Sequence, residues 1–107
     1  MAGFVEVARV RDVPPGTVIV VEVGGHQLAL ANVEGSFFAV DNGCPHRGGS
    51  LGDGSINIQR SEWALECLLH GSVFDVRTGE VLNPPAAVGV GTYDVEVAGG
   101  VVRVSLD

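Results

Sequence analysis

The sequence predicts an all-β protein, and three of its features support this fold class. Valine dominates a hydrophobic share of 46%, and this β-branched residue favours strands over helices. Glycine occupies 16 of the 107 positions, about twice its usual share of roughly 7%, which provides for many tight turns. No window shows the capped, periodic pattern of a long amphipathic helix. A chain of this length has room for one domain with a modest core.

The first half of the chain divides into short strands separated by turn signals. Pro14-Pro15-Gly16 ends the first strand, because proline has no amide hydrogen to donate to a sheet and glycine favours a turn. Gly24-Gly25 supplies the positive φ values of a two-residue hairpin. The expected strands are residues 4–10, 17–23, 26–33 and 36–41.

The second half places two irregular stretches among further short strands. Residues 44–54 contain four glycines and a proline in eleven positions, which predicts a tightly folded loop. Asn83-Pro84-Pro85 predicts a rigid extended loop, since proline cannot join a ladder. A polar stretch lies at 55–62. The expected strands are residues 63–66, 73–76 and 81–82, followed by a hairpin with arms 91–97 and 101–106.

Charge and hydropathy exclude several classes of protein. The formal net charge is −7, with six Lys and Arg against 13 Asp and Glu, and phosphate binding needs clustered cations, so no nucleic-acid partner is expected. An acidic surface instead suits the basic patch of a transient partner, because such charge raises the rate of encounter more than the affinity. The longest strongly apolar run near the N-terminus, 18–23, is far too short to span a bilayer. We therefore expect a soluble, cytoplasmic protein with no membrane contact.

Both cysteines and two of the three histidines lie in two short motifs. Cys44 and His46 form a Cys-x-His motif, and Cys67 and His70 form a Cys-x-x-His motif. One thiolate and one imidazole from each motif make a four-ligand set that suits a metal centre. A disulfide between the cysteines is less favoured, because cytosolic proteins rarely keep one and the paired histidines would be unexplained.

The order of these ligands bears on the kind of metal centre. Structural zinc modules usually hold two cysteines in one turn and two histidines on a following helix, whereas each motif here holds one of each. An iron–sulfur centre with two unlike irons fits better, and zinc stays the alternative. Replacing two thiolates by neutral imidazoles changes the formal charge of an oxidised [2Fe–2S] core from about −2 to about zero, so its reduction potential is expected to rise.

The motifs C-P-H-R-G-G-S-L and C-L-L-H-G-S-V-F-D match a known family, and the chain resembles Rieske-type [2Fe–2S] ferredoxins. The resemblance implies an antiparallel β-sandwich with a small cluster-binding subdomain of two loops. It also implies one cluster per chain, with Cys44 and Cys67 on one iron and His46 and His70 bound to the other through Nδ1. The outer edges of both histidines would face solvent.

The resemblance further implies how the chain is divided and what covers the cluster. One Rieske domain would span 1–107, with 1–42 and 76–107 as the basal β-sandwich and 43–75 as the cluster-binding subdomain. Pro84-Pro85 would cover the cluster, as in other proteins of this family. Partner docking would involve His46, Arg47 and His70.

Function follows from the same resemblance. Such ferredoxins carry one electron at a time from a flavin-containing ferredoxin reductase to a terminal ring-hydroxylating oxygenase, in aromatic hydrocarbon catabolism. The protein would therefore be an electron-transfer component rather than an enzyme, monomeric and in transient contact with both partners. The alternative is a small Rieske-like subunit of a nitrite reductase or another oxidoreductase complex.

Four residues bear on the subtype. Rieske subunits of cytochrome bc complexes have an extra cysteine in each cluster loop and a tyrosine two positions past the loop serine. Gly49 and Leu69 stand where those cysteines would be, and Phe74 replaces the tyrosine. The chain thus looks like the ferredoxins of ring-hydroxylating dioxygenases, such as the carbazole or biphenyl systems. Ser72 departs from that pattern, because it matches the serine that donates to a bridging sulfide in the high-potential class.

Predictions can also be made for other residues, and some of these residues have two interpretations. Glycines near the two motifs form turns or offer N–H groups to sulfide, and leucines there belong to the core or form a lid that excludes water. Trp63 is expected in the core, His26 on a solvent-facing strand, and Arg47 at a docking contact or in a solvated loop. The glycines are Gly48, Gly49, Gly52 and Gly71, the leucines are Leu51, Leu68 and Leu69, and the acids expected at the solvated surface are Asp41, Asp53, Glu62, Glu66 and Asp75.

Overall fold

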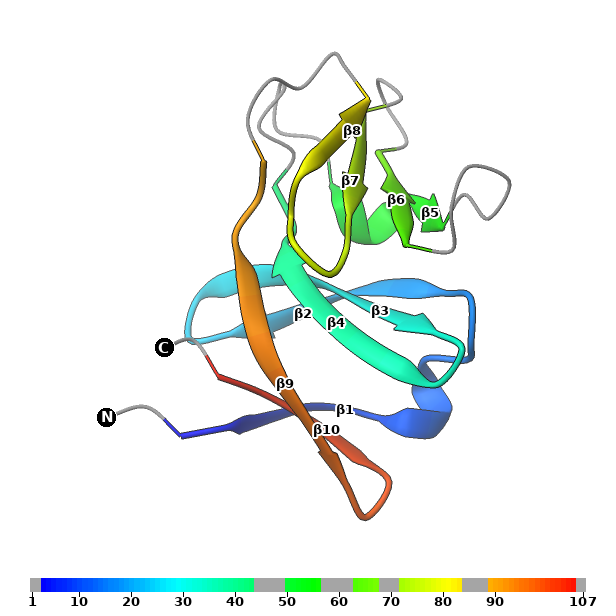
Figure 1. Cartoon of the computed structure of the whole chain (residues 1–107). Helices are drawn as coiled ribbons and strands as arrows, with labels where there is room; N and C mark the ends of the chain where they lie inside the picture. Colours follow the sequence, from blue (N-terminus) through cyan, green and yellow to red (C-terminus); the bar gives the residue numbers. More distant parts are fainter. Residues whose placement is uncertain (1–2, 44–49, 57–62, 68–71, 84–88, 106–107) are drawn as a thin grey trace.

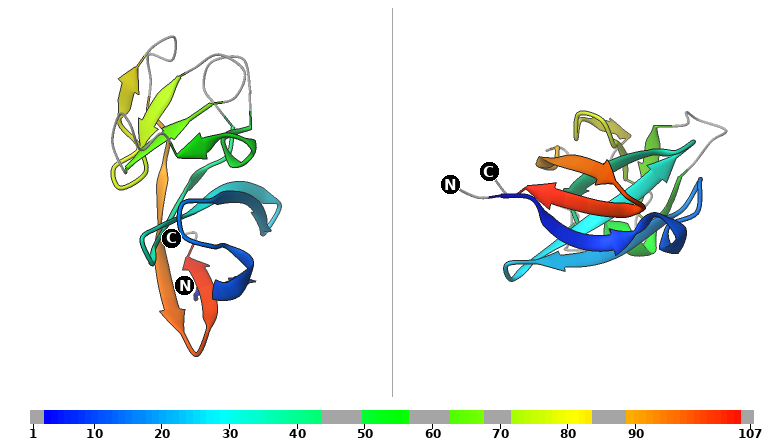
Figure 2. Two further views of the ribbon diagram at one scale, coloured as in Figure 1. Left: turned by 90° about the vertical axis from the view of Figure 1, so that its right-hand side faces the viewer. Right: turned by 90° about the horizontal axis from the view of Figure 1, so that it is seen from below.

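Two antiparallel sheets make up the computed structural model, which describes residues 3–43, 50–56, 63–67, 72–83 and 89–105. The smaller sheet lies above the larger one in Figure 1, and the side view in Figure 2 shows the same two layers. The all-β, antiparallel fold expected from the sequence is confirmed. Every expected strand is present, with ends that differ from the expected ones by no more than one residue.

The larger sheet has six strands in the order β1-β10-β9-β4-β3-β2. Its two edge strands, β1 and β2, lie near each other, so the sheet curls around an interior. Gly24 (φ 55) and Gly25 (φ 83) join β2 to β3 in the left-handed backbone that a two-residue hairpin requires and that glycine adopts without steric cost. The strands are β1 (Val5–Arg9), β2 (Val18–Val23), β3 (His26–Val33), β4 (Ser36–Asp41), β9 (Thr92–Ala98) and β10 (Val101–Ser105).

The smaller sheet has four strands that neighbour one another in chain order. They are β5 (Ser55–Ile56), β6 (Ala64–Glu66), β7 (Val73–Asp75) and β8 (Val81–Asn83). β8 therefore belongs to this sheet, although the division predicted from the sequence ends the small subdomain at residue 75. The reason is local, because the chain turns directly after β7 and the amide of Asp75 donates to the carbonyl of Glu80 at 2.9 Å.

β3 belongs to the larger sheet, and its two faces contribute to two different hydrophobic clusters. All six residues from Leu28 to Val33 are buried, and successive side chains point to opposite faces of the sheet. Leu28 and Leu30 belong to an inner cluster within the larger sheet, whereas Ala29 and Ala31 belong to an interlayer cluster beneath the smaller sheet. The inner cluster is Val13, Val21, Val23, Leu28, Leu30, Phe37, Ala39, Val102 and Val104, and the interlayer cluster is Ala29, Ala31, Val33, Val40, Leu51, Leu65, Cys67, Phe74 and Val76.

Three short elements were not expected from the sequence. They are two 3-10 turns, η1 (Val10–Asp12) and η2 (Leu51–Asp53), and the two-residue strand β5. Elements of two or three residues are too short to show a period, so no pattern marks them. No helix in the described ranges has the length and apolar character that a bilayer crossing requires.

Candidate metal centre

Cys67 is the one predicted metal ligand that lies among the described residues. Its side chain is 1% exposed and packs in the interlayer cluster with Leu51, Leu65 and Phe74. Within the described ranges no three His, Cys, Asp or Glu side chains gather to hold an ion, because the other predicted ligands fall elsewhere. The predicted site residues outside the described ranges are Cys44, His46, Arg47, Gly48, Gly49, Leu68, Leu69, His70, Gly71, Pro84 and Pro85.

The first ligand segment, 44–49, begins and ends at residues that are joined to each other. Gly43 and Ser50 pair in an isolated antiparallel bridge, and the amide of Leu51 donates to the carbonyl of Asn42 at 2.8 Å. The side chain of Asn42, 4% exposed, binds the far end of the segment as well. Its Oδ1 accepts from the amide of Gly52 at 2.6 Å and from Ser50 Oγ at 3.2 Å, while its Nδ2 donates to Ser50 Oγ at 3.0 Å.

Gly52 is required at its position by the close approach of strand β2 and the 3-10 turn η2. A Cβ atom there would lie 2.9 Å from both Asn42 Oδ1 and the backbone nitrogen of Val20, and still nearer to the Val20 side chain. Real Cβ atoms do not approach backbone so closely, so β2 and η2 can pack together only because the residue has no side chain. This packing role was not among the interpretations drawn from the sequence, and the amide of Gly52 donates to Asn42 Oδ1.

The second ligand segment, 67–71, is joined at its base by the β6–β7 hairpin. Glu66 pairs with Val73, and the amide of Cys67 donates to the carbonyl of Ser72 at 2.7 Å. Ser72 is fully buried at this position, directly beside the described ligand. The predicted contact of its hydroxyl with a bridging sulfide remains a prediction.

The bases of the two ligand segments adjoin each other. η2 leads from the first segment into β5, where Ser55 pairs with Glu66, the residue just before Cys67. Gly54 lies so close to the Glu66 carbonyl that an added Cβ would overlap it. Leu51 and Cys67 also share the interlayer cluster. A donor set divided between the two segments therefore arises from neighbouring elements, as one shared metal centre requires.

The proline segment, 84–88, starts and ends beside the same elements. Asn83 pairs with Val73 in the smaller sheet. After the segment, the amide of Val90 donates to the carbonyl of Gly79 at 2.9 Å, and the carbonyl of Gly91 accepts from the amide of Asp41 at 2.9 Å. These pairings attach its two ends next to the bases of the second and first ligand segments, which agrees with the predicted covering role without testing it.

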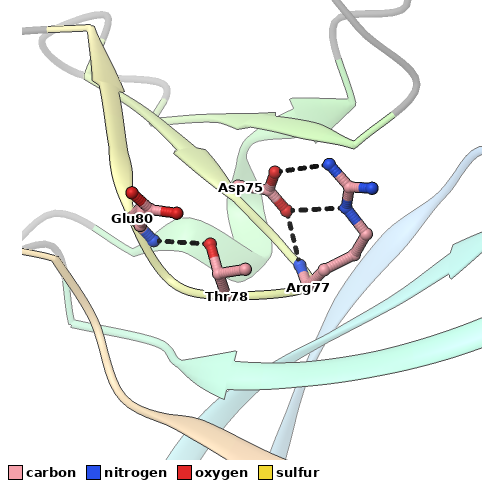
Figure 3. Close-up of polar contacts among 4 residues, drawn as sticks. All are labelled: Asp75, Arg77, Thr78 and Glu80. Atoms are coloured by element: carbon pink, nitrogen blue, oxygen red, sulfur yellow. Dashed lines mark hydrogen bonds and ion pairs between the residues drawn. The ribbon is translucent and has the colours of Figure 1, made fainter.

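Asp75 and Arg77 stabilise the turn that follows β7, as Figure 3 shows. Asp75 Oδ2 accepts from Arg77 Nη2 at 2.8 Å, and Oδ1 accepts from Nε at 3.1 Å and from the Arg77 amide at 2.8 Å. The hydrogen bonds from the Arg77 side chain hold the pKa of this carboxyl below its usual value. The expectation that Asp75 is solvated surface is wrong, because the residue is 8% exposed and needs this partner to be buried.

Arg77 also stacks on Trp63. Its guanidinium carbon lies 4.5 Å from the centroid of the indole ring, whose edge-to-face partner is Phe38 at a centroid distance of 5.6 Å. Trp63 packs against the interlayer cluster, which confirms its expected place in the core. Leu51 is fully buried in the same cluster, so the core interpretation holds for it, and His26 is exposed as expected.

Asp41 joins the end of β4 to the start of β9. Its carboxylate accepts from the amide of Gly91 at 2.9 Å and from the hydroxyl of Tyr93. The hydrogen bond to Asp41 raises the pKa of Tyr93 to about 12. Asp41 was expected at the solvated surface, and unlike Asp75 it remains partly exposed while its carboxylate binds these two partners.

Two residues at this end of the molecule were missed from the sequence, Asn42 and Tyr93. Asn42-Gly43 was interpreted only as a strand breaker, and Tyr93 only as part of a strand. Their partners are distant in the chain, with Gly52 ten residues from Asn42 and Asp41 52 residues from Tyr93. The available signal was weak: a polar residue directly before a predicted ligand loop, and the single tyrosine of the chain.

Comparison with known proteins gives one consistent result. A family model described as the Rieske [2Fe-2S] domain matches residues 3–94. The ferredoxin component of naphthalene 1,2-dioxygenase/salicylate 5-hydroxylase systems from Ralstonia sp. is 36% identical over 94 residues, covering 88% of this chain and 86% of the relative. The ferredoxin component of the naphthalene 1,2-dioxygenase system from Pseudomonas aeruginosa is 35% identical over 103 residues, covering 96% and 95%.

Solved structures show the same similarity. The ferredoxin of carbazole 1,9a-dioxygenase from Nocardioides aromaticivorans has a TM-score of 0.89 at 31% identity, covering 97% of this chain and 98% of that one. A complex of reduced oxygenase and oxidized ferredoxin in carbazole 1,9a-dioxygenase contains a chain with a TM-score of 0.85 at 34% identity, covering 95% and 92%. A nitrite reductase small subunit from Mycobacterium tuberculosis shares the fold, with a TM-score of 0.88, at only 22% identity and coverage of 100% and 97%.

Proposed function

The chain belongs to the Rieske [2Fe–2S] domain family, and from that premise we propose that it is the ferredoxin component of a ring-hydroxylating dioxygenase system. It takes one electron from a flavin-containing ferredoxin reductase and delivers it to a terminal oxygenase. The observation that carries this proposal is the convergence of the bases of both ligand segments and of the proline segment at one end of the smaller sheet.

The donor set fits a Rieske cluster. Cys44 and Cys67 would hold one iron and His46 and His70 the other, and Cys67 already lies in apolar surroundings at the base of its segment. A bound cluster of this kind supplies one-electron chemistry at a potential above that of an all-cysteine cluster. The interlayer cluster around Cys67 keeps water away from that side, and such apolar surroundings influence the potential.

The partners are proposed from the relatives and from charge. A related ferredoxin has been solved in complex with its oxygenase. The net charge of −7 favours encounter with basic patches on both partners, and electrostatic steering of this kind suits contacts that must form and release quickly. We propose a monomer that acts in the cytoplasm, where cysteines stay reduced and remain able to bind a metal.

The chain has no acid–base role in this proposal. The hydroxylation takes place on the oxygenase, and this chain's residues hold the cluster and present it to the partners. The alternative, a subunit of a nitrite reductase, is supported by a likeness of fold alone, because the identity to that protein is 22%. The two relatives described above, at 36% and 35% identity over most of the chain, are ferredoxin components.

The test uses the purified full chain with a ferredoxin reductase and a ring-hydroxylating oxygenase. We expect iron and acid-labile sulfide in equal amounts, a rhombic EPR signal after reduction, and hydroxylation that depends on added chain. A colourless protein with stoichiometric zinc would exclude the proposal. A chain that carries the cluster but elutes only in a stable complex with a reductase subunit would support the alternative.

A His46→Cys variant separates the two metal centres that the sequence left open. In an iron–sulfur centre the added thiolate makes the core more negative, so we expect iron to stay bound and the reduction potential to fall. A zinc module would keep zinc and show no redox signal in either form. Redox titration followed by EPR gives the result.

A further inference from the structure

We propose that Asn42 is a positioning residue whose side chain holds the two ends of the first ligand segment together and so determines how firmly the metal centre is retained. The inference rests on the proposed function, because it takes Cys44 and His46 to be ligands. Asn42 lies two residues before Cys44 and binds the residues that follow the segment. It is therefore placed to act on the ligands without touching the metal.

Every polar group of Asn42 has a partner. The amide donates to the carbonyl of Gln27 at 3.1 Å, and the carbonyl accepts from Leu51 at 2.8 Å. The side chain exchanges hydrogen bonds with Ser50 at 3.0 and 3.2 Å, and Oδ1 accepts from the amide of Gly52 at 2.6 Å. Asn42 thus joins β3, through Gln27, to three consecutive residues on the far side of the segment.

The contact between Asn42 and Gly52 is a buried hydrogen bond at a closely packed position. The amide of Gly52 is buried, and the approach of Val20 leaves no room for a side chain at position 52. A buried N–H group that loses its acceptor is strongly disfavoured. Without Asn42 Oδ1, the base of the segment would have to open until water reaches that amide, and the distance between the two ends would no longer be fixed.

The chain contains a matched control in its other buried asparagine. Asn32, 2% exposed, donates through Nδ2 to the backbone carbonyl of Val13 at 2.6 Å, whereas Asn42 Nδ2 donates to the hydroxyl of Ser50. Its Oδ1 likewise accepts from a backbone amide, that of Gly35 at 2.8 Å. Asn32 stabilises turns of the larger sheet and contacts neither ligand segment through these bonds. Alanine at position 32 therefore measures the general cost of removing a buried asparagine.

The experiment compares Asn42→Ala, Asn42→Asp and Asn32→Ala in the cluster-loaded full chain. We expect Asn42→Ala to release iron to a chelator about tenfold faster than the wild type, the usual size of effect for groups that orient metal ligands. Asn32→Ala should release iron at nearly the wild-type rate. Asn42→Asp keeps an acceptor for the Gly52 amide, so it should restore most of the retention.

Amide hydrogen exchange gives a second readout that does not depend on the electron-transfer activity. In Asn42→Ala we expect faster exchange at residues 43 and 50–52, whereas Asn32→Ala should affect residues 13, 16, 17 and 33–35 instead. Equal iron release from the two alanine variants, or unchanged exchange at 50–52, would overturn the proposal. If the chain holds zinc, the proposed function fails, yet faster zinc release and faster exchange in Asn42→Ala would still support the role of Asn42.

Ser50→Ala covers the case in which Asn42→Ala does not fold. This variant removes the Ser50 hydroxyl and leaves the hydrogen bond from Gly52 to Asn42 in place. We expect this variant to release iron faster than the wild type and Asn42→Asp do. It should release iron more slowly than a chain in which the base of the segment has opened completely. A rate equal to that of the wild type would count against the proposal.

Discussion

The larger and the smaller sheet are stabilised in different ways. Strands of five to eight residues form the larger sheet, so its backbone ladders are long and continuous. Strands of two or three residues form the smaller sheet, and such ladders provide few hydrogen bonds. Side chains compensate there: Asp75 binds Arg77 after β7, and Asn42 binds Ser50 and Gly52 before β5.

This difference indicates where the metal centre contributes to stability. Cys67, the predicted ligand among the described residues, lies in the layer with the shortest strands, and that layer rests on β3 of the larger sheet through the interlayer cluster. Regions with few backbone hydrogen bonds open more easily than long ladders. A metal bound by both ligand segments would link them covalently and stabilise the folded form of this layer. The predictions below test this difference in stability between the two sheets, beginning with the largest expected effect.

Removing one large side chain from each cluster in turn should show whether the two layers unfold separately. Phe74 in the interlayer cluster and Leu28 in the inner cluster are both fully buried. Phe74→Ala should cost about 3–5 kcal/mol and Leu28→Ala about 2–5 kcal/mol. In urea we expect Phe74→Ala to lose the visible absorbance of the metal centre before the far-UV signal of the sheets, whereas both signals should fall together in Leu28→Ala. Coincident transitions in both variants would show that the layers unfold as one unit.

Tyr93 tests a side-chain contact within the larger sheet, where it joins β9 to the end of β4. Removing its hydroxyl in Tyr93→Phe should cost about 1.5 kcal/mol, because the hydroxyl donates to the Asp41 carboxylate. The raised pKa means that this stability is fully present below the ordinary value of 10.0 and is lost as the pH rises through about 12. Since the chain has one tyrosine, ultraviolet difference spectroscopy follows its ionisation directly. Ionisation near 10, or unchanged stability of Tyr93→Phe, would contradict the prediction.

Two carboxylate–arginine ion pairs, one in each layer, should contribute different amounts to the free energy of unfolding. Asp75 binds Arg77 at 2.8 Å and is nearly buried, whereas Glu96 lies 3.8 Å from Arg103 on the surface of the larger sheet. Asp75→Asn keeps an acceptor for the Arg77 amide and removes the charge, at a cost of about 1 kcal/mol. Glu96→Gln should cost no more than about 0.3 kcal/mol.

The Asp75 contribution should also depend on pH in a definite direction. Because its pKa is lowered in the folded state, the stabilisation is present above the ordinary carboxyl value of 3.8 and is lost as the pH falls through the lower folded value. Urea unfolding of wild type and Asp75→Asn at a series of pH values should show a difference that shrinks in acid. A difference that grows in acid would mean that another group is responsible.

Much of the fold could be predicted from the sequence, because its signals are local. Gly24-Gly25 marks a hairpin, Pro14-Pro15-Gly16 ends a strand, and the observed strands follow the expected ones closely. Asp41 and Asp75 were placed at the surface because acidic residues usually lie there. Asp75 is buried against Arg77 and the carboxylate of Asp41 binds Tyr93, and no pattern along the chain reveals which partner a carboxylate will meet.

By itself, the sequence determined the all-β fold class and the family and predicted the four ligands, since a Cys-x-His motif and a Cys-x-x-His motif are defined by residue type and spacing alone. The tertiary structure alone decided how the two segments come together: β5 pairs with β6, Gly52 packs on Val20, and Asn42 joins both ends of the first segment. The physical reason is that these contacts form only after the chain has folded back on itself. Their free energy depends on burial and close approach, which spacing along the chain does not specify.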